Sequence, residues 1–396
     1  MRVRILLQVA PDDGAFGEAE EVGTFAKGAD QLEEVGLSLA ESKAVLAALQ
    51  RRTIELQAAA WIERRRRCTA CGKQLRIKGS YPIIFRTLFG DIHLASPRFH
   101  RCRCRDQAGT ATVSPLKDLL SDHTAPERLY LETRWASLVP YAATAELLAD
   151  VLPIGATINA TTIRAHVLRV AERAEAELGE ERPCFIDGGP ADWQELPPPE
   201  GRIVVGLDGG YVRDWREKIS NFEVIVGRSM PEDRAPRYLG LVHGHDRKPK
   251  RRLVDILRSQ GLQPNQGVTF LTDGGDEIKA LTELISPCGE HVLDWFHIAM
   301  RLTVLGQYAK GVAQVDAAEG TRLLDDLGRL KWRLWHGDIH RAVAELGDLA
   351  DDVDGLELAY PNLGRFRRAM HEFAVYIAEN AGSIINYGER YRAGER

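Results

Sequence analysis

The sequence contains no long hydrophobic run. Its 396 residues include no stretch of about 18 consecutive apolar residues, so we expect no membrane-spanning helix. The segment 1–14 has a short apolar run that acidic residues follow at once, a pattern unlike that of a secretory signal. We therefore expect a cytoplasmic protein, in a compartment where disulfides are rare.

The glycine patterns that bind nucleotide phosphates are also missing. Neither G-x-x-x-x-G-K-S/T nor G-x-G-x-x-G after a strand occurs. Their absence argues against a nucleotide-driven machine and against a dehydrogenase. With 44% hydrophobic and 28% charged residues, the chain has the composition of an ordinary globular protein, and its length favours two or three domains.

Charge is unevenly distributed along the chain. Residues 51–105 contain fourteen Lys or Arg and three acidic residues, a net charge of +11, whereas the whole chain carries −5. The rest of the chain therefore carries −16. A basic module joined to an acidic body is typical of proteins that bind a polyanion, although a solvated charged surface gives the same count.

Cysteine is scarce, and four of the six cysteines fall in this basic segment. They form two closely spaced pairs, C-x2-C and C-x-C, and two such pairs on facing turns bind one tetrahedral zinc ion. The short apolar runs between the pairs predict two strands joined near Phe89–Asp91, as in a zinc ribbon. The predicted ligands of a structural zinc ion are Cys68, Cys71, Cys102 and Cys104.

Other features of this segment leave alternatives open. The second pair is tighter than the usual C-x2-C, His100 is a spare ligand, and four reduced thiols without a metal are the alternative. Cys184 and Cys288 stand alone and are expected to be buried small hydrophobic residues. A zinc ion would fold this small module, and the folded module would present the surrounding arginines. The arginines expected to contact DNA are Arg64, Arg65, Arg66, Arg67, Arg101 and Arg103.

Helices are predicted on both sides of the cysteine module. Residues 1 to about 35 are expected to be loosely organised, and a long helix follows from about Leu39 to Arg65, with Ser38 or Ser42 as its cap. Residues 143–175 have the outline of a helix-turn-helix, with a second helix from about Ala160 to Glu177. Short polar and basic side chains near the start of that helix suit the edge of a DNA major groove, although helical pairs are also common packing units. Its exposed side is expected to carry Thr161, Thr162, Arg164, His166 and Arg169.

A Pro- and Gly-rich linker at 185–201 precedes a segment in which strands and helices alternate. Three short strands, a helix at 249–262 and two further strands predict a mixed sheet with helices on its faces. Residues from Ile298 to about Ala381 are predicted to be helical, with breaks at 354–355 and 361–362. The predicted strands are 203–208, 221–228, 237–245, 268–275 and 291–296.

Two aspartates have the same setting in this segment. Asp208 and Asp273 each end an apolar strand and precede Gly-Gly, and neighbouring strand ends bring such carboxylates together. Two bare carboxylates in contact repel each other, and Mg²⁺ removes that conflict. Two such ions activate a water or hydroxyl and stabilise the leaving oxygen of a phosphodiester. Ordinary turn chemistry is the alternative for Asp-Gly-Gly.

A third polar site is expected where the last strand meets the helical region. Asp294 ends that strand and His297 opens the helices. A histidine beside an acidic site positions a phosphate or a proton. A purely structural histidine is the alternative.

The order of these parts resembles a DDE transposase of a bacterial insertion sequence, most closely the ISKra-type group and more distantly the Mutator-like transposases. The stretches that carry the resemblance are VVGLDGGYVR, FLTDGGDEI, LDWFHIAMRL and INYGERYRAGER, which cover about 202–396. The cysteine-rich and helix-turn-helix parts also resemble the N-terminal half of that family. Each motif alone is weak, and the combination is fairly specific.

The resemblance implies a ribonuclease-H-like core with a helical insertion between the second Asp and a final Glu. Asp208 and Asp273 would be the first two catalytic carboxylates and would hold Mg²⁺ or Mn²⁺, and Asp294 and His297 would form the D-x-x-H patch that follows them. The implied reaction is cleavage at the element's ends and transfer of the freed 3′-hydroxyl to target DNA. The implied state is a homo-oligomer on double-stranded DNA, in a bacterial cytoplasm and at the nucleoid when bound.

The third acid departs from the family pattern. In the group resembled, a Glu follows the NYGERYR segment, whereas here the sequence stops at Arg396. We expect the third acid beyond Arg396, in a chain truncated at its C-terminus. Glu389 is the in-chain candidate, beside Glu379 and Glu395.

The sequence thus predicts an α/β transposase whose third acid is missing. The alternatives are a catalytically incomplete protein that recognises transposon ends, and an RNase-H-type nuclease acting on structured DNA. The expected parts are an N-terminal helical region (1–66), a zinc-ribbon-like basic module (67–111), a helix-turn-helix region (112–184), the linker (185–201), the first part of the catalytic core (202–297), and the helical insertion with the incomplete end of the core (298–396).

Overall fold

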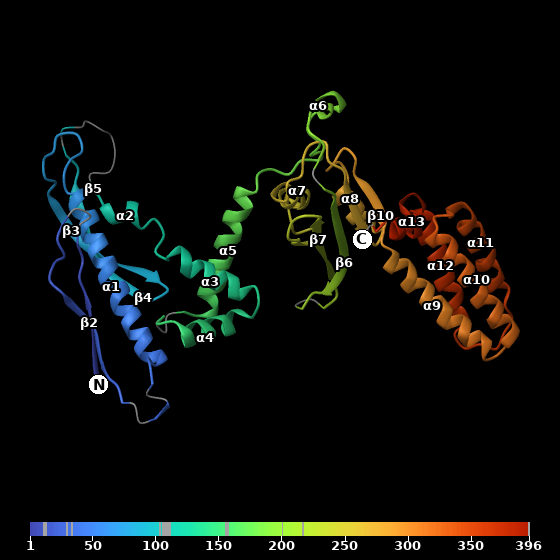
Figure 1. Cartoon of the computed structure of the whole chain (residues 1–396), viewed down its shortest axis with the longest axis horizontal. Coiled ribbons are helices and arrows are strands. Elements are labelled where there is room, and N and C mark those ends of the chain that lie inside the picture. Colours follow the sequence, from blue (N-terminus) through green and yellow to red (C-terminus); the bar gives the residue numbers. More distant parts are fainter. Residues whose placement is uncertain are drawn as a thin grey trace. The chain divides into compact units, whose positions relative to one another are not determined.

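The computed structural model describes residues 1–10, 14–28, 31–32, 35–102, 104, 112–154, 158–199, 201–215 and 218–394. The chain divides into two compact units, Met1–Glu177 and Leu178–Arg396, which can be followed by colour in Figure 1. This division falls shortly before the predicted linker. Within the described ranges, none of the helices has both the length and the apolar character needed to cross a membrane.

The first unit begins with a β-hairpin. β1 (Arg2–Leu7) pairs antiparallel with β2 (Glu20–Ala26), from Arg2 opposite Ala26 to Leu7 opposite Glu20. The alternation of charged and aliphatic residues in RVRILL is the period-two pattern of a strand. The prediction of a loosely organised start is therefore wrong for these residues, because the strand's partner lies more than ten positions downstream, beyond an acidic, glycine-containing stretch.

The predicted long helix is confirmed as α1 (Leu39–Arg64), which begins with a capping box. The backbone N of Glu41 donates to Ser38 Oγ at 3.2 Å, and the backbone N of Ser38 donates to Glu41 Oε2 at 2.8 Å. Two of the helix's unpaired N-terminal donors are thereby satisfied. Of the two expected caps, Ser38 is therefore the one that is used.

An antiparallel sheet follows α1, built from β3 (Ile77–Thr87), β4 (Gly90–His100) and the short β5 (Thr112–Val113). The predicted turn between the two long strands is confirmed, and Gly90 occupies it at φ +119°, in the region that favours glycine. The apolar core between α1, α2 and this sheet consists of Ala58, Ile83, Ile92, Leu94 and Leu116.

The described part of the first unit ends with helices. α4 and α5 are the two helices predicted on either side of Pro153, and Leu148 and Ile163 between them are fully buried. Asn159 caps α5, because its Oδ1 accepts a hydrogen bond from the backbone N of Thr162 at 2.9 Å. The helices are α2 (Pro115–Leu119), α3 (Pro126–Ala136), α4 (Tyr141–Val151) and α5 (Ala160–Glu177).

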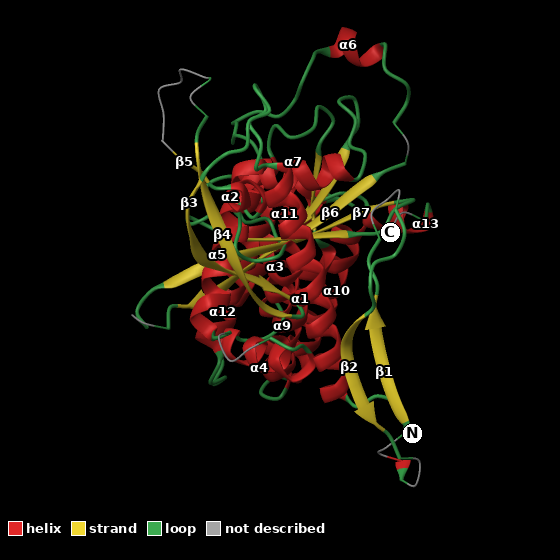
Figure 2. Ribbon diagram, turned by 90° about the vertical axis from the view of Figure 1, so that its left-hand side faces the viewer, coloured by secondary structure: helices red, strands yellow, loops and turns green. Residues whose placement is uncertain are grey.

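The second unit is built on a five-stranded mixed sheet in the order β10-β9-β6-β7-β8, whose strands are yellow in Figure 2. β6 to β8 are antiparallel neighbours, while β9 is parallel to β6 and β10 is parallel to β9. α6 (Pro190–Gln194) precedes the sheet, α7 (Pro249–Ser259) links β8 to β9, and α8 (Asp276–Thr282) links β9 to β10. All five predicted strands are present, as β6 (Ile203–Arg213), β7 (Asn221–Pro231), β8 (Arg237–Val242), β9 (Val268–Thr272) and β10 (Glu290–Leu293).

β6 is longer than predicted. The strand was expected to end at Asp208, but it continues through Arg213 because β7 pairs with it along its whole length. β9, in contrast, pairs with β6 only from Ile203 to Gly206. Asp208 therefore lies just past the point where β6 loses one of its two neighbours.

The two faces of the sheet have different surroundings. Val205 and Leu207 of β6 are buried against Leu253 of α7 and Ile278 of α8, in one apolar cluster. Because side chains alternate along a strand, Asp208 faces the opposite side. Helices α7 and α8 cover the first face of the sheet, and Asp208 lies on the second face.

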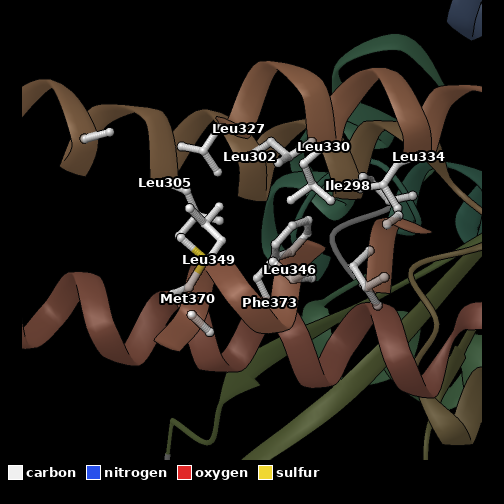
Figure 3. Packing of buried hydrophobic residues seen from close by; sticks show 14 of the residues in the cluster. Ile298, Leu302, Leu305, Leu327, Leu330, Leu334, Leu346, Leu349, Met370 and Phe373 are labelled. Carbon is white, nitrogen blue, oxygen red and sulfur yellow. The ribbon is translucent and has the colours of Figure 1, made fainter. Parts of the chain in front are cut away.

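The predicted helical region is confirmed as a C-terminal helical segment with its own apolar core. Figure 3 shows leucines from several helices meeting there, including Leu302, Leu327 and Leu349, together with Phe373. The first helix begins at Trp295, earlier than the Ile298 expected, because Asp294 caps it. The elements are α9 (Trp295–Ala313), α10 (Ala317–Trp335), α11 (Ile339–Gly355), α12 (Leu363–Glu379), a 3₁₀ turn (Ala381–Ser383) and α13 (Tyr387–Arg392).

Candidate functional site

The four predicted zinc ligands meet in space. Cys68 Sγ is 3.5 Å from Cys104 Sγ, and Cys71 Sγ is 3.4 Å from Cys102 Sγ. All four sulfur atoms lie within 4.8 Å of one another. Four sulfurs at about 2.3 Å from a zinc ion form a tetrahedron with edges of about 3.8 Å, so the cluster has the size of a zinc site.

The backbone around Cys68 is shaped to hold a thiolate. Gly72 adopts φ +70°, and its backbone N donates to the carbonyl oxygen of Cys68 at 2.9 Å, which closes the turn. Hydrogen bonds from the backbone N–H groups of Cys71 and Ala70 lower the pKa of the Cys68 thiol to about 6. The sulfurs of Cys102 and the other two cysteines raise the pKa of Cys104 to about 12. A bound cation would remove this repulsion among the sulfurs.

The remaining candidates for sulfur or nitrogen ligation lie elsewhere. His100 is not part of the four-sulfur group, and its backbone N pairs with the carbonyl of Arg76 at 2.9 Å. Cys184 and Cys288 are both exposed, so the expectation that they are buried is wrong. Each follows a proline directly in a surface loop, and neither lies in an apolar run long enough to bury it.

The arginines next to the cysteine module are largely solvent-accessible. Arg64, Arg67 and Arg101 are exposed. Arg65 is exposed too, with its guanidinium 4.3 Å from the centre of the Trp61 ring and 3.1 Å from Asp118. Arg66 is half-buried and pairs with Glu63 at 3.5 Å. Arg103 lies outside the described residues.

The predicted DNA-facing side of α5 is present only in part. Thr161 and Arg164 are exposed, whereas Thr162 is half-buried beside its Asn159 partner. Arg169 is half-buried and pairs with Asp122 at 3.2 Å. His166 contradicts the expectation of an exposed residue.

His166 instead belongs to a buried charged network. Its Nδ1 contacts Glu132, whose side chain is fully buried, and Glu132 accepts from Arg128 Nε at 2.9 Å. Arg128, which is 1% exposed, also reaches Asp91 of the β3–β4 hairpin at 2.8 Å. Sequence reasoning missed this network, although Arg128 and Glu132 have the i, i+4 spacing of a helical pair.

Three aspartates of the second unit, Asp208, Asp273 and Asp294, lie just past the segments in which β6, β9 and β10 pair with one another. Gly206 and Leu271 are the last pair of β6 and β9, and two residues after it come Asp208, still within β6, and Asp273, in the turn that follows β9. Asp294 follows on the next strand, because Leu293 is in register with Thr272. Neighbouring strands are about 4.8 Å apart, so the backbones of the three residues lie near one another.

The three aspartates are less tightly gathered than the four cysteines. Among the described residues, the cysteine cluster is the sole group of three or more His, Cys, Asp or Glu whose ligand atoms all lie within 4.8 Å. Asp294 Oδ1 is also engaged, because it accepts from the backbone N of Phe296 at 3.0 Å as the cap of α9. Asp273 Oδ1 is engaged in the same way, because it accepts a hydrogen bond from the backbone N of Gly275.

The turn that carries Asp273 is held by the helical segment. Tyr376 of α12 donates its hydroxyl to the carbonyl oxygen of Asp273 at 2.8 Å, and Gly275 N donates to Asp273 Oδ1 at 3.0 Å. Gly274 has φ +89°, and a side chain there would overlap the amide of Asn380. This turn thus requires glycine for two independent reasons.

His291 connects the strand before this turn to the helical segment through two side-chain hydrogen bonds. His291 Nε2 lies 2.7 Å from Thr272 Oγ1, and its Nδ1 lies 2.7 Å from Ser383 Oγ. Burial lowers the pKa of His291. A neutral imidazole donates one of these hydrogen bonds and accepts the other, so it suits this position. The sequence offered no signal for this residue beyond its place one strand away from Asp273.

A cavity of about 420 Å³ opens beside Asp208 on the second face of the sheet. His297 lines it, with its Nε2 3.9 Å from Asp294 Oδ2. Asp208, Asp294 and His297 therefore share one hollow, whereas Asp273, the predicted partner of Asp208, is not among the described residues that line it. The described residues around it are Gly206, Leu207, Asp208, Val226, Gly227, Arg228, Tyr238, Leu271, Asp294, Phe296 and His297.

Of the in-chain candidates for a third acid, Glu379 and Glu389 do not line this cavity. Glu389 is exposed on α13, where its backbone N donates to Asn386 Oδ1 at 3.0 Å, and it does not line the cavity. α13 packs through Tyr387, whose hydroxyl donates to the carbonyl of Leu293 at 2.6 Å. Glu395 lies outside the described residues.

Comparison with known proteins leaves the family open. The sequence matches no protein-family model, and it matches no curated protein at a significant level. The proposed function therefore rests on the fold and on the geometry of the site.

Proposed function

We propose that this protein is a DNA-processing enzyme of the transposase type. Its second unit would be a ribonuclease-H-like core that cleaves and joins DNA strands with a divalent cation held by Asp208 and Asp273. The observation that supports the proposal is the register of β6 and β9, because Asp208 and Asp273 each come two residues after the last pair of these parallel strands, Gly206 and Leu271.

The connectivity of the sheet supports the same proposal. Three antiparallel strands are followed by two parallel strands, each reached through a helix, in the order β8-β7-β6-β9-β10. This is the strand order expected of a ribonuclease-H-like core. The helical segment α9 to α12 comes directly after β10, where the resemblance to insertion-sequence transposases implies a helical insertion.

The two carboxylates fit a hard divalent cation. Asp208 is exposed and Asp273 is half-buried, so both can keep water among a cation's ligands. Mg²⁺ or Mn²⁺ bound here would activate a water or a 3′-hydroxyl and stabilise the leaving oxygen. His297 faces the same cavity and would hold a phosphate or a proton beside Asp294.

The first unit supplies the features expected of a DNA-binding region. Zinc held by the four cysteines would fix the two turns of a small basic module and direct its arginines outwards. Thr161 and Arg164 near the N-terminus of α5 are accessible to a major groove. We propose that this unit binds the double-stranded ends of a mobile element and that the protein acts on them as a homo-oligomer.

A second candidate is a DNA-binding protein that does not cleave. It is favoured by Glu389, which is exposed on α13 and away from the cavity that Asp208 lines. Such a protein would recognise element ends and compete with a complete enzyme.

Strand cleavage separates these candidates. Purified protein is incubated with Mg²⁺ or Mn²⁺ and a supercoiled plasmid that carries the DNA flanking the coding sequence, and nicking is followed on gels. We expect nicking that is lost in Asp208→Asn and in Asp273→Asn. Asp255→Asn, an exposed aspartate on α7, is the matched control and should nick normally.

The other outcomes are equally informative. Specific binding without nicking would favour the non-cleaving protein. Cleavage of branched DNA with no dependence on the flanking sequence would favour an RNase-H-type nuclease. Nicking that persists in both aspartate variants would refute the proposed site.

A further inference from the structure

Three residues of neighbouring strands form a row on the second face of the sheet, next to Asp208, and we call this row the platform. Gly206 of β6, Arg228 of β7 and Tyr238 of β8 lie in one row, since Gly206 is in register with Arg228 and Arg228 with Tyr238. Asp208 lies two residues along β6 from this row. All four residues line the cavity of about 420 Å³.

Space remains in this cavity above β6 because Gly206 has no side chain. A Cβ placed on Gly206 would meet no atom within 4 Å. Nothing in its backbone requires glycine, because its φ is not positive. Gly227, next to Arg228 on β7, is different, since a Cβ there would overlap Leu239 and Leu207.

Two aromatic residues that line the cavity are largely exposed. Tyr238 is 68% exposed and Phe296, at the start of α9, is 65% exposed. The guanidinium of Arg228 lies 5.7 Å from the centre of the Tyr238 ring, and the ring of His297 lies 5.8 Å from that of Phe296. Each of these two aromatic rings thus has a nitrogen-containing side chain beside it.

We propose that this cavity binds a single unpaired nucleobase of a DNA strand, with the adjoining phosphate directed towards Asp208. The inference rests on the proposed function, and it names the part of the substrate that the core holds. Exposed aromatic faces that stack bases, combined with cations that follow the backbone, are how proteins bind single-stranded nucleic acid. The volume lies within the range of small-ligand sites.

The lining favours a nucleotide over a protein helix. A helix that covered this face would bury the charged groups of Asp208, Arg228 and Asp294, at a cost that its apolar contacts would have to offset. A nucleotide has a planar apolar base for Tyr238 and Phe296. It also has an anionic phosphate for Arg228 and for a cation at Asp208.

Fluorescence of a base analogue tests the proposal. A single-stranded oligonucleotide with one 2-aminopurine is titrated with the full-length protein without divalent cations, so that no strand is cut. Quenching reports stacking, and anisotropy reports the affinity. We expect Tyr238→Ala and Gly206→Val to abolish the quenching and to weaken binding at least about fivefold, the lower bound for losing one stacked base. Tyr238→Trp should restore both.

Two control variants match these substitutions. Gly240→Val makes the same change on β8, where a Cβ also meets nothing within 4 Å but the residue does not line the cavity. Trp332→Ala removes an aromatic residue that is 62% exposed on α10. Both should quench and bind like the unchanged protein, and circular dichroism and zinc content should be the same for all variants.

Three results would overturn the proposal. The first is quenching that survives in Tyr238→Ala or Gly206→Val, and the second is an equal loss in Gly240→Val. The third is a change of oligomeric state in Tyr238→Ala on sedimentation, which would mean that a second copy covers this face. A protein that quenches in a Tyr238-dependent way but never nicks would keep the base subsite and reject the proposed cleavage.

Discussion

Arg128→Met should strongly destabilise the first unit. Arg128 is 1% exposed and joins Glu132 of its own helix to Asp91 of the β3–β4 hairpin. Methionine keeps most of the side chain's volume but leaves Glu132, which is fully buried, without the guanidinium and with the imidazole of His166 as its remaining contact in this network. Breaking a buried ion pair from one side costs about 3–5 kcal/mol.

Amide hydrogen exchange measures this loss in the intact chain. A loss of about 3 kcal/mol accelerates exchange through unfolding of the unit roughly a hundredfold, because each 1.4 kcal/mol is about tenfold. The peptides to follow are those of α3 and α5. Arg134→Met, at an exposed position of α3, should change them by less than about threefold. Exchange in Arg128→Met as slow as in Arg134→Met would refute the argument.

The same network predicts a pH dependence with a definite sign. Burial raises the pKa of Glu132, but hydrogen bonds from His166 and Arg128 outweigh it and hold that pKa below its usual 4.5. A lowered folded-state pKa means that the carboxylate stabilises the fold fully above about pH 4.5 and loses this contribution as the pH falls. Glu132→Gln should flatten the acid limb of the stability curve, and an unchanged limb would contradict this assignment.

Other perturbations have equally direct readouts. Cys68→Ser should abolish stoichiometric zinc in purified protein, measured by elemental analysis, whereas Cys184→Ser should leave it unchanged; equal loss in both would disprove the four-sulfur site. Gly274→Ala should lower the stability of the second unit by about 1–3 kcal/mol in thermal unfolding, because of the strained φ and the overlap with Asn380. Tyr376→Phe should cost about 1 kcal/mol and raise the Mg²⁺ concentration needed for nicking, since it frees the Asp273 turn; an unchanged metal requirement would argue against such support.

Local patterns were sufficient to predict most elements of the fold. Helical spacing and a capping serine identify α1, and apolar runs bounded by glycine identify the five strands of the second unit. The length of β6 was not predictable in this way, because Gly209 and Gly210 read as a turn. They stay in the strand since β7 supplies hydrogen-bond partners as far as Asn221. Tertiary pairing here overrides local preference.

The candidate site was also predictable only in part, because some of its contacts join residues that are far apart in the sequence. The four cysteines were predicted from their spacing, and Asp208 and Asp273 were singled out as expected strand ends, although β6 continues past Asp208. His166 was misassigned because its partner, Glu132, is fully buried and lies one helix and two loops away in the sequence. The platform of Gly206, Arg228 and Tyr238 was invisible, since only the register of three strands brings these residues into one row.

The helical segment has a role in the acidic site that its position in the sequence conceals. Its apolar core fixes α12, and α12 in turn presents Tyr376 and Asn380 to the turn that carries Asp273. Ser383, just beyond α12, reaches the same turn through His291. Repacking the core around Phe373, one helical turn from Tyr376, should therefore disturb the Asp273 turn, and with it the cation site proposed there, before it disturbs the sheet, because the turn depends on α12 whereas the strands depend on their own cluster.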